Sequence, residues 1–211
     1  MPATNARRTS LLRLGLVALA TFPASCGGGG DGAAAPAVRY FTSVSDEIWK
    51  TDGTEAGPVR VKDINPGAGS SRPIGSTVFN NAVYFSAFDG TSGFELWKSD
   101  GSGARAVRVK DINPGANGSI PGGLTVFNNA LYFSANDGTS GFELWRSDGT
   151  EAGTVRVKDI NPGAGGSGPF GFTVLNNALY FFADDGTNGF ELWRSDGTEA
   201  GTVRVKLPRN V

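Results

Sequence analysis

The side chains in this chain that could do chemistry are carboxylates placed at regular intervals. Three glutamates stand before a Leu-Trp pair and three follow an Asp-Gly-Thr turn: Glu95, Glu143 and Glu191, and Glu55, Glu151 and Glu199. Two carboxyl groups hydrolyse a glycosidic bond when they share a cleft and have different environments. Because the repeated glutamates have nearly identical sequence contexts, we expect them to be solvated, or paired with the basic residues of the Val-Arg-Val-Lys segments, and not catalytic.

Aspartates form a second recurring group. Asp-Gly-Thr clusters begin at Asp89, Asp137 and Asp185, and similar clusters follow each Trp. Carboxylate and carbonyl oxygens are suitable ligands for Ca²⁺, so calcium binding is one interpretation. However, the EF-hand spacing of acidic residues with a terminal Glu is absent, and Asp-Gly is a common pair in hairpin turns. We therefore expect turn residues, with calcium as the alternative, and we predict no other cofactor or metal.

Tryptophans recur with a constant spacing of 48 residues: Trp49, Trp97, Trp145 and Trp193. Aromatic side chains at regular intervals could form platforms on which sugar rings stack. Each Trp nevertheless lies inside an apolar run, where a large ring most simply fills space between packed elements. We expect core packing at these positions.

The composition excludes several functional classes. The chain has 19 basic and 20 acidic residues and no histidine. Removing Arg7, Arg8 and Arg13 with the N-terminal segment leaves 16 basic against 20 acidic residues, a net charge of −4. Such interspersed, mildly acidic charge offers no basic stripe for phosphates, so we expect no nucleic-acid partner. The absence of histidine removes both the usual proton shuttle at neutral pH and the commonest metal ligand.

Residues 1–25 have the three parts of a secretory signal peptide. Arg7 and Arg8 give a basic start, an apolar run covers residues 11–22, and Ala24-Ser25 supplies small residues before a cut. The run is too short to span a bilayer. Cys26, the only cysteine, follows directly and resembles the lipidated cysteine of bacterial lipoproteins. In the alternative, the protein is secreted without a lipid and Cys26 falls near the cut or is lost.

The segment between Cys26 and the first repeat is a tether. Residues 26–37 consist mostly of Gly and Ala, which gives a flexible linker with nothing to pack. We therefore expect an exported protein at the outer membrane or cell surface as a lipoprotein, and otherwise a periplasmic or secreted one. The membrane would be contacted only through the lipid anchor.

Residues 38–211 are built from tandem units of 48 residues that must position all of these side chains. The stretch from Phe142 to Lys158 is identical to that from Phe190 to Lys206. In the third unit, short apolar runs at 124–127, 130–134, 142–146 and 154–158 alternate with turn residues, as strands of an antiparallel meander do. Asn128-Asn129, Asp137-Gly138 and Asp148-Gly149 are the predicted turns, and the long segment 159–168 would carry the chain to the next sheet.

The predicted fold class is all-β and β-propeller-like, with about four blades. Four antiparallel strands in 40 to 50 residues is the period of a propeller blade. In Phe142-Glu-Leu-Trp-Arg146, Leu144 and Trp145 point to opposite sides, as expected for a sheet packed between two others. The first unit lacks an opening strand, which gives fifteen strands, so the array is an imperfect ring, an open arc that self-associates, or a piece of a longer array.

These units resemble the bacterial ELWxxDGT repeat family over residues 38–211. The motif is complete at 143–150 and 191–198, begins at Glu95-Leu96-Trp97, and is altered to Glu47-Ile48-Trp49 in the first copy. The resemblance implies extracytoplasmic β-propeller-like repeats whose role is largely undefined. It therefore bears on fold and location more than on function.

The sequence favours a non-catalytic exported module at the cell envelope that acts in binding or surface assembly, with an unknown protein or glycan as its ligand. A purely structural array that self-associates is the first alternative, together with a truncated fragment of a larger propeller. A propeller polysaccharide hydrolase or lyase is the least favoured, because such enzymes break their symmetry at the active site and these units are nearly alike.

Overall fold

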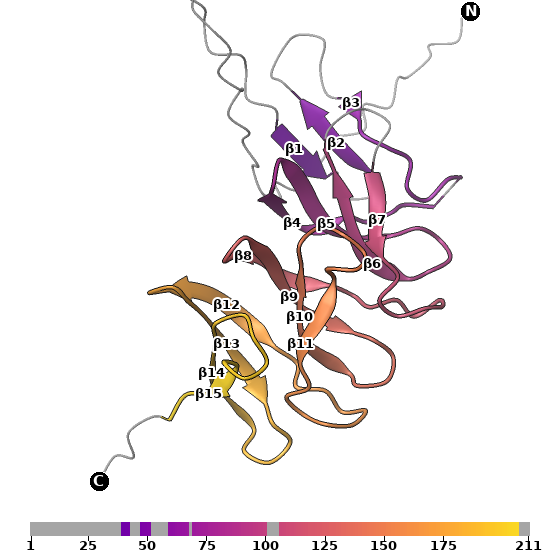
Figure 1. The fold of residues 1–211 in the computed structure, drawn as a ribbon. Coiled ribbons are helices and arrows are strands. Elements are labelled where there is room, and N and C mark those ends of the chain that lie inside the picture. The colour runs from indigo at the N-terminus through magenta and orange to yellow at the C-terminus, as the bar shows by residue number, and fades with distance from the viewer. Residues whose placement is uncertain (1–38, 43–46, 52–58, 68, 101–105, 207–211) are drawn as a thin grey trace, which may run out of the picture.

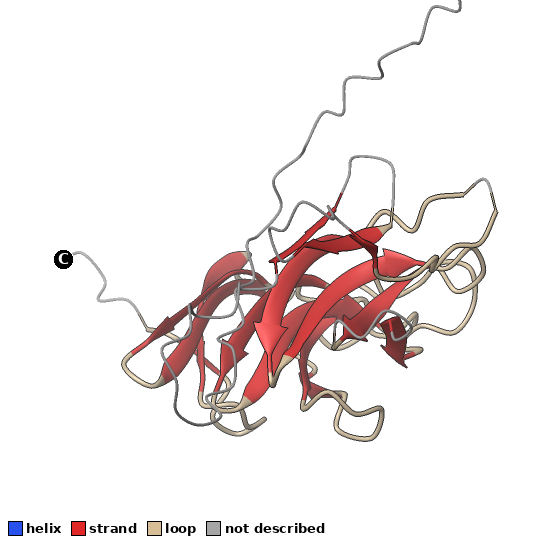
Figure 2. Ribbon diagram, turned by 90° about the horizontal axis from the view of Figure 1, so that it is seen from above, coloured by secondary structure: helices blue, strands red, loops and turns tan. Residues whose placement is uncertain are grey.

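The computed structural model of the chain describes residues 39–42, 47–51, 59–67, 69–100 and 106–206. These residues form fifteen β-strands and no helix (Figures 1 and 2), so none of the described segments is a helix able to cross a membrane. The strands are β1 Arg39–Thr42, β2 Ile48–Thr51, β3 Val59–Arg60, β4 Ile74–Phe79, β5 Ala82–Phe88, β6 Phe94–Ser99, β7 Ala106–Lys110, β8 Gly122–Phe127, β9 Ala130–Asn136, β10 Phe142–Ser147, β11 Val155–Lys158, β12 Phe170–Leu175, β13 Ala178–Asp184, β14 Phe190–Ser195 and β15 Val203–Arg204.

The strands form four antiparallel sheets, each a meander of consecutive strands. Sheet 1 holds β1–β3, sheet 2 holds β4–β7, sheet 3 holds β8–β11 and sheet 4 holds β12–β15. The predicted tandem units and the count of fifteen strands are confirmed. β8 begins two residues earlier than predicted, because Gly122 pairs with Ser134 across a register shift. β9 extends to Asn136, which pairs with Phe142.

The connections use the predicted turn residues. Asn128 and Asn129 both have positive φ, 45° and 53°, as a two-residue type I′ hairpin requires, and the same pair of conformations recurs in units 2 and 4. Gly138 and Gly149 have φ of 81° and 93°, values that most side chains resist. These turns confirm that the Asn-Asn and Asp-Gly pairs reverse the chain.

The sheets carry apolar side chains on both faces, and three buried clusters join each sheet to the next one along the chain. We call the side carrying Leu96, Leu144 or Leu192 the leucine face, and the opposite side carrying the unit's Trp the tryptophan face. Leu144 shares a buried cluster with sheet 4, whereas Trp145 shares another with sheet 2. The leucine face of one sheet thus packs on the tryptophan face of the next, which confirms the two-sided pattern predicted for β10.

Lysines add a repeated polar link between sheets. The Nζ atoms of Lys62, Lys110 and Lys158 each donate to a backbone oxygen of the next sheet's unit, those of Ala106, Thr154 and Thr202, over 2.9 Å. The same lysine contact is therefore repeated at each of the three junctions, and it holds each sheet against the next in the same way.

The opening strands lie together on the inner side of the array. β8 contacts both β4 and β12, and Thr77 Oγ1 donates to the backbone oxygen of Leu124 over 2.9 Å. The sheets fan out from these strands, and sheets 1 and 4 lie at opposite ends of the molecule (Figure 1). The described chain is therefore an arc, which is the open form among the predicted alternatives.

Candidate functional site

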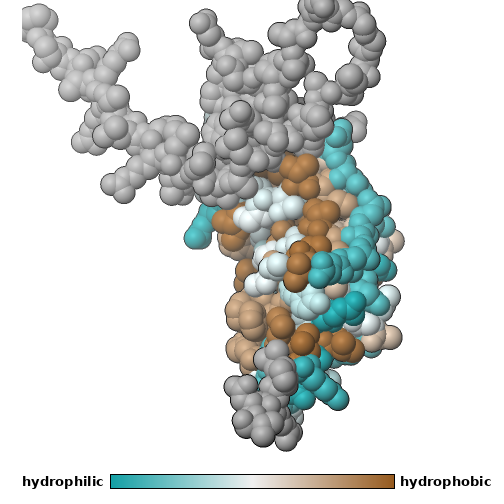
Figure 3. Space-filling view, turned by 90° about the vertical axis from the view of Figure 1, so that its left-hand side faces the viewer, coloured by the Kyte–Doolittle hydropathy of each residue, from teal (hydrophilic) through white to brown (hydrophobic). Residues whose placement is uncertain are grey.

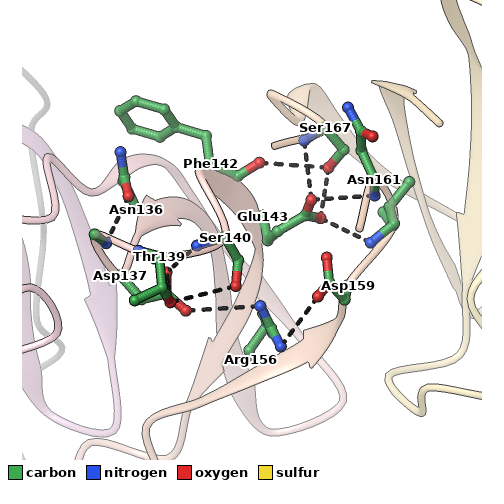
Figure 4. A network of polar contacts seen from close by, with 12 residues as sticks. Asn136, Asp137, Thr139, Ser140, Phe142, Glu143, Arg156, Asp159, Asn161 and Ser167 are labelled. Atoms are coloured by element: carbon green, nitrogen blue, oxygen red, sulfur yellow. Dashed lines mark hydrogen bonds and ion pairs between the residues drawn. The ribbon is translucent and has the colours of Figure 1, made fainter. Parts of the chain in front are cut away.

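A buried carboxylate stands at the junction between successive sheets. Glu143, in β10, has 0% of its surface exposed. Its Oε1 accepts hydrogen bonds from the backbone N–H groups of Asn161 (3.2 Å) and Ser167 (2.9 Å). Its Oε2 accepts from the N–H of Ile160 (3.0 Å) and the hydroxyl of Ser167 (2.7 Å), as Figure 4 shows. All four donors belong to the connector between β11 and β12.

Ser167 carries this contact into the next sheet. Its backbone oxygen accepts from the N–H of Asp184, in β13 of sheet 4. Beside it, Gly166 approaches the backbone of Phe142 so closely that a Cβ would lie 2.3 Å from that residue's nitrogen. Glu143 therefore fixes the position from which the chain enters sheet 4, and the tight approach requires glycine.

The arrangement recurs in the two preceding units and corrects the prediction from sequence. Glu95 accepts from Ile112, Asn113 and Ser119 in the same geometry, and Glu47 accepts from Ile64 and Ser71. The expectation that Glu95 and Glu143 are solvated or paired with Lys and Arg is wrong, because the connector folds back and supplies N–H donors to them.

The remaining glutamates are placed differently. Glu191 is partly buried, and Glu151 and Glu199 are exposed. Glu55 lies outside the described residues. Of these, the three that the structure describes, Glu151, Glu191 and Glu199, do not share the full burial of Glu95 and Glu143.

Burial has the largest effect on the pKa values of Glu95 and Glu143. It raises the pKa of Glu95 and Glu143 above the usual range, and the hydrogen bonds from the serine and the backbone N–H groups counteract part of that rise. Neither carboxyl reaches solvent. A group enclosed in this way cannot touch a substrate, so its chemistry is that of a structural acceptor.

The basic residues pair with aspartates. Arg156 lies 3.6 Å from Asp137 and 3.3 Å from Asp159, and Arg108 is placed alike between Asp89 and Asp111. The pairs with Asp137 and Asp89 join the last strand of a sheet to the loop that precedes its third strand, and those with Asp159 and Asp111 join it to the connector that follows. Because they are partly exposed, each contributes little to stability on its own.

The Asp-Gly-Thr clusters are turns, as predicted. Asp137 Oδ1 accepts from the N–H of Thr139 (2.9 Å), its hydroxyl (2.9 Å) and the N–H of Ser140 (2.7 Å), and Asp89 and Asp185 make the same kind of contacts. Within the part of the chain that the structure describes, no group of three or more His, Cys, Asp or Glu side chains could hold a metal.

We predict that calcium does not stabilise the protein. The Oδ1 atoms of Asp89, Asp137 and Asp185 already accept at least three hydrogen bonds each from their own turns, so a cation would have to displace these donors. Thermal melts in millimolar Ca²⁺ and in excess chelator should coincide. An upward shift of several degrees with Ca²⁺ would revive the metal interpretation.

The turn aspartates also predict a dependence of stability on pH. Hydrogen bonds from Thr187 and Asn188 hold the pKa of Asp185 well below its usual range. A carboxyl whose pKa is lower in the folded state stabilises the fold above its unfolded pKa of about 3.9, and this contribution is lost as the pH falls below that value. Asp185→Asn should therefore flatten the fall in melting temperature between about pH 5 and pH 2.5. Parallel curves for the two proteins would contradict this prediction.

The tryptophans fill space between sheets. Trp97, Trp145 and Trp193 have only 7%, 7% and 6% of their surface exposed, which confirms the prediction of core packing for them. Trp49, on the tryptophan face of sheet 1, is only partly buried. Sugar stacking on a row of four exposed indoles is therefore excluded.

A shallow groove runs along the opening strands on the inner side of the arc. Its volume is about 400 Å³. It is lined by Gly75, Ser76, Thr77, Gly123, Leu124, Thr125, Gly171 and Phe172. Thr77 and Thr125 donate their hydroxyls to the backbone oxygens of Leu124 and Gly123, so their oxygens remain as acceptors beside the ring of Phe172. This combination can bind a polar ligand.

The sequence reasoning missed this groove. Its residues look like ordinary strand positions, and only the convergence of β4, β8 and β12 brings them together. The one available signal was the glycine near the start of each opening strand, at positions 75, 123 and 171, all with positive φ. The lipidation site predicted at Cys26 lies outside the described residues.

Comparison with solved structures identifies the architecture. Neither a protein-family model nor a curated protein matches the chain. A puromycin hydrolase mutant complexed with PGG is similar to 91% of this chain with a TM-score of 0.56 and 15% identity. A xyloglucanase from Xanthomonas campestris is similar to 80% with a TM-score of 0.52 and 18% identity. A structure from a study of two prolyl endopeptidases is similar to 82% with a TM-score of 0.51 and 14% identity.

These similarities show the fold alone. The fold is all-β and β-propeller-like. The chain spans 31%, 28% and 25% of the lengths of those three chains, respectively, and at such low identity their activities are not transferred to it. The resemblance to the ELWxxDGT repeats stays a prediction.

Proposed function

We propose that this protein is a non-catalytic, exported repeat module of the cell envelope that acts in binding or surface assembly. The observation that carries the proposal is the enclosure of Glu95 and Glu143, both 0% exposed and each accepting four hydrogen bonds from the connector. The most regular carboxylates of the sequence are thereby committed to holding successive sheets together.

The surfaces left for a partner are the inner groove and the ends of the arc. The groove offers Ser76, Thr77 and Thr125 with Phe172, a combination of hydroxyl groups and one ring that suits a glycan or an extended protein segment. The proposal also includes the location. Residues 1–25 would direct export, Cys26 would carry a lipid, and residues 26–37 would hold the repeats away from the membrane.

Three measurements on the exported full chain test the proposal. Metabolic labelling with a palmitate analogue should mark the protein and should fail with Cys26→Ala. Arrays of envelope polysaccharides and peptides should yield a ligand whose binding is lost in Ser76→Arg and Thr125→Arg, which fill the groove, and is kept in Val107→Arg on an outer strand. Incubation with the same polysaccharides should release no reducing ends. Sustained hydrolysis would overturn the proposal.

A further inference from the structure

Among the described sheets, the leucine face of sheet 4 is the one that no other described sheet covers. In sheets 2 and 3, Phe79 and Phe127 are each 4% exposed, whereas Leu175, at the corresponding position in sheet 4, is 56% exposed. Leu96 and Leu144 are fully buried, but Leu192 is only partly buried. Val107 (43% exposed) and Val203 (45% exposed) are exposed at the same position in two different units, so they play no part in this comparison.

The sequence departs from the repeat on this face, where Phe170 and Phe182 replace Gly122 and Ser134 of the preceding unit with large apolar side chains. Phe182, 42% exposed, stands where the other units have Ser86 and Ser134. Its ring lies 5.6 Å from that of Phe170, which in turn lies 5.4 Å from that of Phe190, itself 59% exposed. On the side seen in Figure 3, hydrophobic side chains continue down to the C-terminal end of the molecule. An exposed cluster of three rings is a mark of an interaction surface.

The position of Phe182 indicates what kind of sheet would cover this face. On the leucine face of sheet 3, the space next to Gly123 is filled by Phe172, which comes from the opening strand of sheet 4. The ring of Phe172 would lie 2.6 Å from a Cβ added at Gly123. On the leucine face of sheet 4, the space next to Gly171 is filled instead by Phe182 of the same sheet, whose ring would lie 3.4 Å from an added Cβ. A covering sheet with an opening strand like β12 would collide with Phe182, so the matching sheet lacks that side chain.

Sheet 1 fits this requirement. Within the described residues, sheet 1 has three strands and no opening strand. On its tryptophan face Trp49 is only partly buried, although its counterparts in the other three sheets are 6–7% exposed.

Sheet 4 also presents the side chains that make a polar contact at the internal junctions. The Asp-Gly turns of units 3 and 4 lie against the preceding sheet: a Cβ on Gly149 would meet the hydroxyl of Tyr84, and Lys98 Nζ donates to the backbone oxygen of Gly149 over 2.7 Å. Sheet 4 presents Tyr180 and Arg194 at the positions of Tyr84 and Lys98, so its uncovered face carries an equivalent pair of polar side chains.

We propose that a second copy of this chain docks head to tail, with the tryptophan face of its sheet 1 on the leucine face of sheet 4. The two ends of one arc lie far apart (Figure 1), so the contact forms between copies. It continues the intramolecular stacking from one chain into the next. Such a heterologous interface closes a ring or extends a filament, according to the angle between copies. This inference rests on the proposed role in surface assembly and names its partner.

The first test measures mass. The full chain, exported through its own N-terminal segment and purified in mild detergent, should sediment in a density-matched buffer with the mass of two or more copies and dissociate on dilution. Phe182→Ser, which restores the residue of the other units, should raise the dissociation constant about tenfold or more. Val107→Ser, equally exposed on sheet 2, should leave it unchanged. A monomer at all concentrations, or equal effects of the two variants, would overturn the proposal.

The second test identifies the two faces. Phe182→Asp and Trp49→Asp should each be monomeric, and their mixture should form a one-to-one complex, because each retains the end that the other lacks. A contact between two copies of sheet 4 predicts instead that Trp49→Asp alone stays associated, which would exclude head-to-tail docking. If Trp49→Asp lowers the melting temperature, Arg60→Asp replaces it in this experiment, because Arg60 lies on the same face of sheet 1.

The two proposals fail in different ways. A natural protein that is monomeric but still exported and able to bind its ligand would refute this docking alone. A protein that associates but is not exported would refute only the proposed function.

Discussion

Replacing Glu143 by alanine is expected to lower the free energy of unfolding by roughly 3 kcal/mol or more, because a buried donor left without an acceptor costs about 1–3 kcal/mol. The substitution removes the acceptor of four hydrogen bonds at once, from Ile160, Asn161 and Ser167. It also leaves a cavity in a fully buried position. Urea denaturation followed by circular dichroism measures the loss.

The chain contains its own control for this experiment. Glu191 occupies the same position in sheet 4, but it is only partly buried, and Pro208 stands where Ile160 supplies an N–H in the preceding unit. Glu191→Ala should therefore cost less than about 1 kcal/mol, as substitutions outside buried networks do. Equal losses at the two positions would show that the connector does not depend on the buried carboxylate.

Glu143→Gln separates the charge from the shape. The glutamine oxygen can still accept two hydrogen bonds, but its NH₂ group would face two N–H or O–H donors, so we expect an intermediate loss of about 1–3 kcal/mol.

The effect of Glu143→Gln should also depend on pH. Burial raises the pKa of Glu143, so the folded state binds its proton more tightly than the unfolded chain does. The contribution of this group is thus fully present below its unfolded pKa and falls as the pH rises through the folded value. The difference in the free energy of unfolding between Glu143→Gln and the natural protein should accordingly be smallest at a pH above the folded pKa of Glu143.

Trp145→Ala is expected to cost about 3–5 kcal/mol, the range found when a buried aromatic side chain is removed from a core. Trp145 is 7% exposed and packs with Phe79, Tyr84 and Leu96 of the preceding sheet. Its loss opens the junction between sheets 2 and 3, so the urea midpoint should fall sharply. A soluble, folded variant with a nearly unchanged midpoint but weaker ligand binding would show that this ring serves recognition.

Trp145→Phe provides the matched comparison. Phenylalanine keeps much of the apolar surface, and the indole N–H of Trp145 has no hydrogen-bond partner in the structure, so no polar contact is lost. We expect a loss of about 1–2 kcal/mol, well below that of alanine. The difference between the two variants measures the contribution of ring volume to the stacking of sheets.

The order and turns of the strands were predictable because they depend on local features. Asn128 and Asn129 tolerate positive φ, the Asp137-Gly138 pair closes a turn on its own backbone, and apolar residues on both sides of β10 indicate a sheet with two neighbours. Each of these signals lies within a few residues of the structure that it specifies. Because the units share these motifs, the strands and turns predicted for one unit could be expected in the others.

The sequence by itself determined the all-β units, their strands and the placement of three tryptophans in the core, since period, turn residues and apolar pattern are properties of neighbouring residues. Only the tertiary structure decided the role of Glu143, whose donors lie 17, 18 and 24 residues further along the chain. Backbone N–H groups are present at almost every residue and leave no mark in a sequence. The uncovered face around Phe182 was likewise decided by the fold, because exposure depends on which sheet has a neighbour, and identical residues are buried in one unit and open in the next.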